Sequence, residues 1–85
     1  MCSLTFTNEA WLDYIWWQQQ DKKTLKKINE LLSACSRFPF EGIGQPEALK
    51  GDLSGLWSRH IDKKNRLVYQ ADDSRVTVIS CRNHC

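Results

Sequence analysis

The sequence predicts an α+β domain, because two segments with helical spacing are followed by segments with the composition of β-strands. Apolar side chains recur at helical spacing over residues 9–19 and 22–35. Residues 56–61 and 66–70 are rich in strand formers and are separated by the polar turn 62–65, as in a β-hairpin. Helices and hairpin strands in separate stretches are typical of the α+β class.

Length and composition limit the classes of function. The 85 residues form one domain, 1–85, with a single modest core. The N-terminus lacks a basic region followed by an apolar run, and no segment is apolar enough to span a bilayer, so we expect a cytoplasmic protein without a membrane partner. A net charge of +2 permits a nucleic-acid partner without requiring one. Four irregularly spaced cysteines predict reduced thiols and complete no zinc site, so no metal or cofactor is expected.

The first elements are a short strand and a helix. Residues 3–7 predict the strand, and Thr7 or Asn8 can cap the helix over residues 9–19. The apolar face of this helix is unusually wide, and we expect its inward side chains to be Trp11, Tyr14 and Ile15. One sheet cannot bury both tryptophans that follow, Trp16 and Trp17, so one of them is a candidate contact with a partner.

Asp21 is the expected cap of the second helix, which ends near Cys35. Its inward positions are Leu25, Ile28, Leu31, Leu32 and Cys35. Its outward positions include Lys22, Lys23, Lys26 and Lys27. A basic face of this kind is most often only solvated, although it would also suit an acidic protein or RNA. Because almost nothing joins the two helices, they should form an antiparallel pair.

The segment from residue 37 to 54 is predicted to be a long ordered loop that leads into the hairpin. Five prolines and glycines interrupt any regular period: Pro39, Gly42, Gly44, Pro46 and Gly51. Long loops in small domains often carry function, and this one brings Glu47 and Lys50 near the hairpin. After the hairpin, residues 72–74 form a turn and residues 76–81 a third strand of the sheet.

The hairpin is predicted to place two arginines on one face. If Ile61 pairs with Arg66, alternation puts Arg59 and Arg66 on the same side of the sheet, beside Trp57. Two neighbouring guanidinium groups repel each other, and a phosphate is the anion that fits them best. The alternative is that both arginines are solvated and bind nothing, which is the usual state of an exposed charge.

Four stretches of the chain resemble the YoeB family of toxins in the RelE superfamily of bacterial mRNA interferases. They are NEAWLDYIWWQQQDKKTLKKINELL, PFEGIGQPEALKGDLSGLWSRHI, RLVY and CRNH, in this order. The resemblance covers nearly the whole chain. It implies a compact RelE-like fold, in which two N-terminal helices pack on a twisted, mainly antiparallel sheet. It also implies a ribosome-dependent endoribonuclease that cleaves mRNA in the decoding site without a metal, by attack of the 2′-hydroxyl on the phosphate.

The same resemblance assigns roles to single residues. Glu47 matches the family's general base, Arg66 its phosphate-binding cation and His84 its general acid. The residue types suit these roles, because a carboxylate near cations stays ionised, a planar guanidinium fits a phosphate, and imidazole donates protons near neutral pH. Flanking phosphates would be held by Lys50, Arg59 and Arg82. As an alternative for each residue taken alone, Glu47 is a plain loop carboxylate, Arg66 a charge on the sheet surface and His84 an idle tail residue.

The sequence departs from many relatives at three positions. Cys85 stands where they end in a tyrosine that helps to hold the substrate or orient the acid, His60 replaces a second arginine, and Asn65 replaces a histidine. The resemblance implies a YefM/Phd-type antitoxin as partner, operator DNA bound through that antitoxin, and a homodimer as one expected state. Cys85 supports an alternative function, a catalytically weakened toxin that acts mainly as the co-repressor of its antitoxin.

Overall fold

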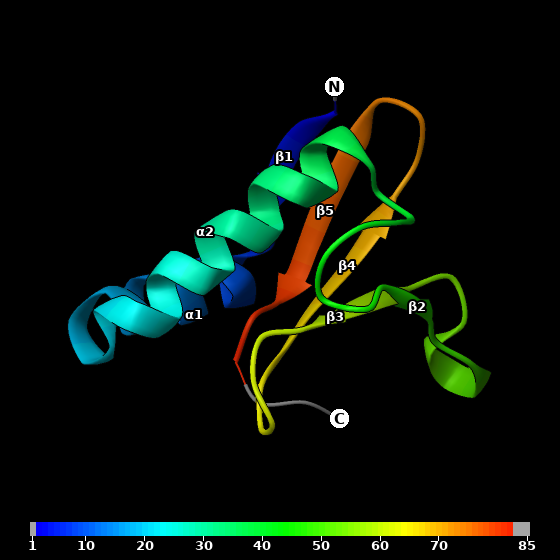
Figure 1. Ribbon diagram of the computed structural model, residues 1–85. Helices are drawn as coiled ribbons and strands as arrows, with labels where there is room; N and C mark the ends of the chain where they lie inside the picture. Colours follow the sequence, from blue (N-terminus) through cyan, green and yellow to red (C-terminus); the bar gives the residue numbers. More distant parts are fainter. Residues whose placement is uncertain (1, 83–85) are drawn as a thin grey trace.

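The structure is a computed structural model that describes residues 2–82. Within these residues, five strands form one sheet in the order β1-β5-β4-β3-β2, and β1 alone pairs in parallel. The strands are β1 (Ser3–Phe6), β2 (Glu47–Ala48), β3 (Trp57–His60), β4 (Arg66–Ala71) and β5 (Arg75–Ser80). Two antiparallel helices, α1 (Asn8–Gln20) and α2 (Lys22–Arg37), lie over β1 and β5, whereas β3 and β2 extend beyond them (Figure 1). The predicted α+β architecture is confirmed.

Side-chain caps begin both helices where the sequence predicts them. The Thr7 hydroxyl accepts a hydrogen bond from the Ala10 amide at 3.1 Å, and this satisfies one of the free N–H groups in the first turn of α1. The Asp21 carboxylate accepts bonds from the amides of Lys23 and Thr24, both at 3.1 Å. Asp21 directly follows α1 and precedes α2, so it is the single residue that separates the two helices.

The core lies between the helices and one face of the sheet. Most predicted inward residues of α2 are buried: Ile28, Leu31, Leu32 and Cys35. Leu25 is partly buried against them. Cys2, Cys35 and Cys81 are free thiols, as predicted. Burial raises the pKa of Cys81 to about 12, with Asp13 adding to the effect, so this thiol is unreactive. No helix within residues 2–82 combines the length and apolar character needed to cross a membrane.

The aromatic residues of α1 do not pack as the sequence predicts. Ala10 and Trp17 are its buried residues, whereas Trp11 is 50% exposed. The indole N–H of Trp17 donates to the Cys81 carbonyl at 2.8 Å, so this ring gains both burial and a hydrogen bond at the end of β5. Trp11 instead packs beside Phe6 and Tyr14, with ring centroids 5.9 and 6.0 Å away, at the β1 edge of the sheet. The prediction that Trp11 is core was wrong because the wide apolar face is covered on one side only.

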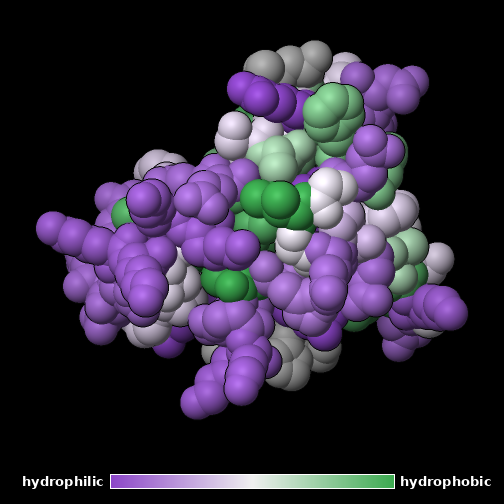
Figure 2. All heavy atoms as spheres, viewed as in Figure 1, coloured by the Kyte–Doolittle hydropathy of each residue, from purple (hydrophilic) through white to green (hydrophobic). Residues whose placement is uncertain are grey.

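The side of the molecule that α2 crosses is mostly hydrophilic, with hydrophobic residues gathered in its middle (Figure 2). Lys22, Lys23 and Lys26 are exposed, and Lys27 is half-buried. Three of these lysines line a groove of about 480 Å³ between α2 and the hairpin turn, together with Thr24, Glu30, Ile61 and Asp62. The basic face predicted for this helix is therefore accessible.

The hairpin has a different register from the predicted one. His60 pairs with Arg66, and Arg59 pairs with Leu67. Because side chains alternate, a shift of one residue moves a whole strand's side chains to the other face. Trp57, Arg59, Leu67 and Tyr69 consequently face the core side. The other side, here named the open face, carries Ser58, His60, Arg66 and Val68. Arg59 and Arg66 lie on opposite faces, so the predicted arginine pair does not exist.

Candidate active site on the open face of the sheet

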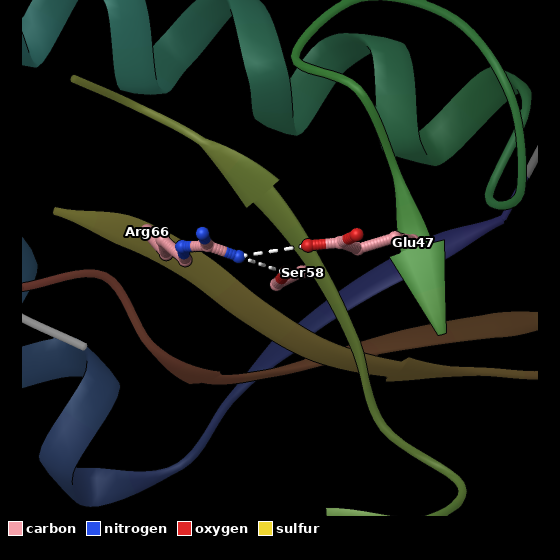
Figure 3. A network of polar contacts seen from close by, with 3 residues as sticks. All are labelled: Glu47, Ser58 and Arg66. Atoms are coloured by element: carbon pink, nitrogen blue, oxygen red, sulfur yellow. Dashed lines mark hydrogen bonds and ion pairs between the residues drawn. The ribbon is translucent and has the colours of Figure 1, made fainter. Parts of the chain in front are cut away.

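Glu47, Ser58 and Arg66 form a polar network on the open face. Register brings them together, because Glu47 of β2 pairs with Ser58 of β3, and Ser58 lies diagonally across from Arg66 of β4. Arg66 Nη1 donates to Glu47 Oε1 at 2.9 Å and to Ser58 Oγ at 3.4 Å. The side chains of Glu47 and Arg66 point toward one another across β3 (Figure 3). Two residues assigned by the resemblance, far apart in the chain, thus meet in the folded protein.

This ion pair is open to solvent. The Arg66 side chain is 33% exposed and that of Glu47 is 56% exposed. Ion pairs of this exposure contribute about 0–1 kcal/mol to stability, because water competes with each partner. An anion that reaches Arg66 can therefore replace the carboxylate with little loss of folding free energy. The network has the charge and access needed to bind a phosphate beside a free carboxylate.

An apolar cavity of about 140 Å³ adjoins the network. Arg66 and Ser58 belong to its wall, so whatever occupies the cavity lies next to the Glu47–Arg66 pair. The remaining wall is mainly aliphatic and comes from the 3₁₀ turn Gly51–Leu53, its flanks, the strands β4 and β5, and the first turn of α1. The lining residues are Glu9, Leu49, Leu53, Leu56, Val68, Ile79 and Ser80.

The structure corrects the role predicted for Arg59. Its side chain is 0% exposed, and on the core side its guanidinium donates to Tyr69 Oη at 3.1 Å and to the carbonyls of three loop residues. Those bonds are to Ile43 at 3.0 Å, Phe38 at 2.6 Å and Glu41 at 2.9 Å. A guanidinium with these partners cannot hold a flanking phosphate of RNA on the open face. The prediction was wrong because it paired Ile61 with Arg66, whereas His60 pairs with Arg66 in the structure.

Tyr69 completes the buried polar group around Arg59. Its hydroxyl accepts from Arg59 and donates to the Pro39 carbonyl at 2.7 Å. Burial raises the pKa of Tyr69 to about 12, against the opposing effect of the Arg59 hydrogen bond. The hydroxyl consequently keeps its proton and its bond to the loop at all physiological pH values. Burial also raises the pKa of the neighbouring Cys35 thiol, which the charge of Arg59 partly offsets.

The other predicted site residues are placed as follows. Lys50 is exposed and comes directly before the 3₁₀ turn, two residues beyond β2. Arg82 lies two residues beyond β5, with its Cζ 3.7 Å from the ring centroid of Trp16. A guanidinium stacked on a ring still directs its N–H groups outward in its own plane, so its assignment to RNA stays a prediction. His84 and Cys85, the predicted acid and the orienting position, lie outside the described residues.

Sequence reasoning missed Ser58 and the apolar cavity. The serine belongs to the second of the quoted stretches, within LSGLWSR. The predicted hairpin register, however, placed it on the opposite face of the sheet from Arg66. The spacing of Leu49, Leu53 and Leu56 along the loop was the available indication of an apolar cluster. This spacing was overlooked because two glycines and two charged residues interrupt it.

Comparison with known proteins identifies the class to which this fold and site belong. Residues 6–85 match a family model described as YoeB-like toxin of bacterial type II toxin-antitoxin system. The chain is 54% identical over 81 residues to Toxin YoeB of Synechocystis, an alignment that covers 95% of this chain and 94% of that toxin. The chain therefore belongs to the YoeB-like toxins.

Solved structures agree with this assignment. The YoeB dimer from Staphylococcus aureus superposes with a TM-score of 0.90 at 47% identity, covering 99% of this chain and 98% of that chain. The heterotetrameric YoeB-YefM toxin-antitoxin complex from the same species gives 0.89 at 46% identity, covering 100% and 99%. The fold is that of this toxin family throughout.

Proposed function

We propose that this toxin is a ribosome-dependent endoribonuclease that cleaves mRNA in the decoding site and so inhibits translation. The observation that carries the proposal is the 2.9 Å pair of Glu47 and Arg66 on the open face. A carboxylate and a guanidinium at this distance are the base and the phosphate ligand that 2′-hydroxyl attack requires. Their exposure leaves room for an RNA strand.

The pair suggests an order of events in the reaction. The scissile phosphate binds Arg66 and replaces Glu47, whose carboxylate is then free to accept the proton of the 2′-hydroxyl. The 2′-oxygen forms a bond to phosphorus, and the bond from phosphorus to the 5′-oxygen breaks. His84 supplies the proton that the departing 5′-oxygen needs. Charge on the phosphoryl oxygens is stabilised by Arg66, while Lys50 and Arg82 hold flanking phosphates. None of these steps needs a metal ion.

One surface and one comparison support the partners that this function needs. The groove between α2 and the hairpin turn, with three lysines, provides cations for ribosomal RNA away from Glu47 and Arg66. A YefM/Phd-type antitoxin is the expected inhibitor, since the S. aureus relative is found in a YoeB-YefM complex. Operator DNA would be bound through that antitoxin. The toxin would act in the cytoplasm, where its ribosomes are.

The test is cleavage by an Arg66→Ala variant. We expect its single-turnover cleavage rate on mRNA-programmed ribosomes to fall at least 100-fold, with the cleavage sites mapped by primer extension. The reason is that a group that stabilises the developing charge contributes roughly 2.7–4 kcal/mol to the transition state. Its melting temperature should change little, since the lost ion pair is exposed. Lys63→Ala, in the solvated hairpin turn, is the matched control and should cleave at the wild-type rate. Unchanged cleavage by folded Arg66→Ala protein would remove this residue from the site.

A second candidate function is co-repression by a catalytically weakened toxin. Cys85 favours it, because a thiol cannot stack on a base as the tyrosine of many relatives can. The two candidates differ in the behaviour of the unmodified protein. Tight operator binding by the toxin-antitoxin complex, together with a cleavage rate on programmed ribosomes no higher than that of Arg66→Ala, would establish the second.

A further inference from the structure

Arg59 is a fully buried cation whose partners are all neutral. Within residues 2–82 its guanidinium donates to three carbonyls of the segment 38–43 and to the Tyr69 hydroxyl. Burial of an arginine without a carboxylate is unfavourable unless its hydrogen bonds are satisfied. Here each of the three guanidinium nitrogens has an acceptor. The segment that provides them contains no helix or strand, so these bonds hold backbone that has no ladder of its own.

The anchored segment leads directly to Glu47. Only residues 44–46 separate the Ile43 carbonyl from β2. Gly44 is clamped in this interval, because its carbonyl accepts from the His60 amide at 2.7 Å and a side chain there would meet Leu31 at 2.7 Å. Its φ of +83° adds a second reason for glycine. The anchored segment 38–43 and the Gly44 bond to β3 together set the path of the chain into Glu47.

The β2 strand alone gives Glu47 little support. It is a two-residue strand at the edge of the sheet, and both of its residues are exposed. Its contacts with β3 are its single pairing in the described sheet. We propose that Arg59 is a positioning residue for Glu47: through its hold on the segment 38–43, it sets where β2 pairs and where the Glu47 carboxylate meets Arg66. This inference rests on the proposed function for its catalytic consequence, but not for its structural part.

The planar shape of arginine suits this task in a way that lysine cannot reproduce. The acceptors lie in three directions around the guanidinium, and its five N–H groups point in fixed directions within one plane. An ammonium group has three N–H groups at one point and cannot reach all four acceptors. Arg59→Lys keeps the charge and removes the geometry, whereas Tyr69→Phe keeps the arginine and removes one acceptor together with the bond to Pro39.

The structural part is tested by amide hydrogen exchange. The reporter is the Leu49 amide, which donates to the Leu56 carbonyl at 2.9 Å just beyond β2. We expect its protection to fall at least tenfold in Arg59→Lys and by a smaller factor in Tyr69→Phe. Val76→Ala, a buried substitution on β5 whose strand partners are Leu4 and Ala71, is the control for general loss of stability. If the Leu49 amide loses as much protection in a Val76→Ala protein with the same urea midpoint, the proposal is overturned. If Arg59→Lys does not fold, the protection of the Leu49 amide in Tyr69→Phe decides whether the proposal holds.

The catalytic part is tested by a double-mutant cycle with Glu47→Gln. Arg59→Lys should lower the single-turnover cleavage rate at least tenfold in the unmodified protein while leaving ribosome affinity unchanged. In the Glu47→Gln background it should have no further effect, because a residue that acts through Glu47 has nothing left to position. If Arg59→Lys lowers the cleavage rate by the same factor in both backgrounds, Arg59 has only a general structural role, and the proposed positioning role is overturned. If the unmodified protein does not cleave at all, the proposed function fails, and the exchange measurement still decides the structural claim.

Discussion

The indole ring of Trp16 holds the guanidinium of Arg82, the last described residue of the chain. The 3.7 Å separation from the ring centroid is that of a close cation–π contact, and the ring itself packs edge-on against Trp17 at 4.9 Å. Trp17 in turn is bonded to the Cys81 carbonyl. Adjacent tryptophans of one helix thus fasten adjacent residues at the end of β5.

We predict that Trp16→Leu lowers the free energy of unfolding by about 0.5–2 kcal/mol through loss of this contact. Urea denaturation measures the loss, and Trp16→Phe, which keeps an aromatic face, should recover part of it. Arg82→Gln should lower the free energy of unfolding of the unmodified protein and leave that of the Trp16→Leu variant nearly unchanged. Equal effects of Arg82→Gln in both backgrounds would show that the ring does not hold the guanidinium.

At the level of single residues, motif and geometry give different kinds of information. The quoted motifs were enough to select Glu47 and Arg66 as candidates, and the structure places their charged groups 2.9 Å apart. Arg59 could not be placed in the same way, because its face depends on a register that the polar turn 62–65 does not specify uniquely. In the structure, Asp62 Oδ1 accepts from the amides of Lys64 and Asn65, and the strand pairing starts at His60. A difference of one residue in the hairpin register therefore decides whether Arg59 is placed on the open face, where it could contact RNA, or on the core side, where it binds the loop.

Among the elements, the junction of the two helices rests on one side chain. The Thr24 hydroxyl and the amides of Thr24 and Lys23 donate to the Asp21 carboxylate and lower its pKa below the ordinary value of 3.8, against the opposing effect of desolvation. Because the folded-state pKa is lowered, the carboxylate stabilises the fold above its unfolded pKa. That contribution is lost as pH falls through the folded pKa.

We therefore predict that Asp21→Ala lowers the melting temperature at neutral pH, because α2 loses its cap. The difference between the unmodified protein and this variant should be constant from pH 7 to about 5 and shrink below about pH 4. Thermal denaturation followed by circular dichroism across this range measures it. A difference that persists unchanged at pH 2 would mean that the charged form of Asp21 is not what caps the helix.

The elements themselves were largely predictable, because their signals are local. The caps at Thr7 and Asp21 and the inward residues of α2 follow from spacing and residue type. Which aromatic of α1 is buried does not follow, since that choice depends on the position of the Cys81 carbonyl at the end of a distant strand. β2 was also absent from the prediction. Two residues carry no periodicity, and they form a strand only because β3 offers a partner.

For the molecule as a whole, one edge of the sheet carries unpartnered apolar surface. β1 is the outermost strand, and Trp11, at 50% exposure, packs beside it with Phe6 and Tyr14. Leu4 and Leu12 are 39% and 66% exposed. Exposed aromatic groups at a sheet edge are typical of a contact with another chain. The S. aureus relative is described as a dimer, and we predict that a homodimer of this chain would use this edge.

We predict that Trp11→Ser raises the dissociation constant of the dimer at least tenfold, because aromatic residues at the centre of an interface commonly contribute more than about 1.4 kcal/mol. Sedimentation velocity over a concentration series measures it. Ile43→Ser, equally exposed at 48% but in the loop, should leave the constant unchanged. A dimer weakened by Ile43→Ser and untouched by Trp11→Ser would place the interface at the loop instead.

The parallel pairing of β1 with β5 has a consequence for how the toxin is made. β5 joins β1 to β4, and Ser3 of β1 is matched to Arg75 of β5. During synthesis, the first strand emerges early and has no neighbour in the sheet until β5 has been added. The β3–β4 hairpin, whose contacts are local, can form in the meantime. The nascent chain therefore carries Glu47 and Arg66 before it has a complete sheet to support them, and the last strand decides when a toxic molecule exists.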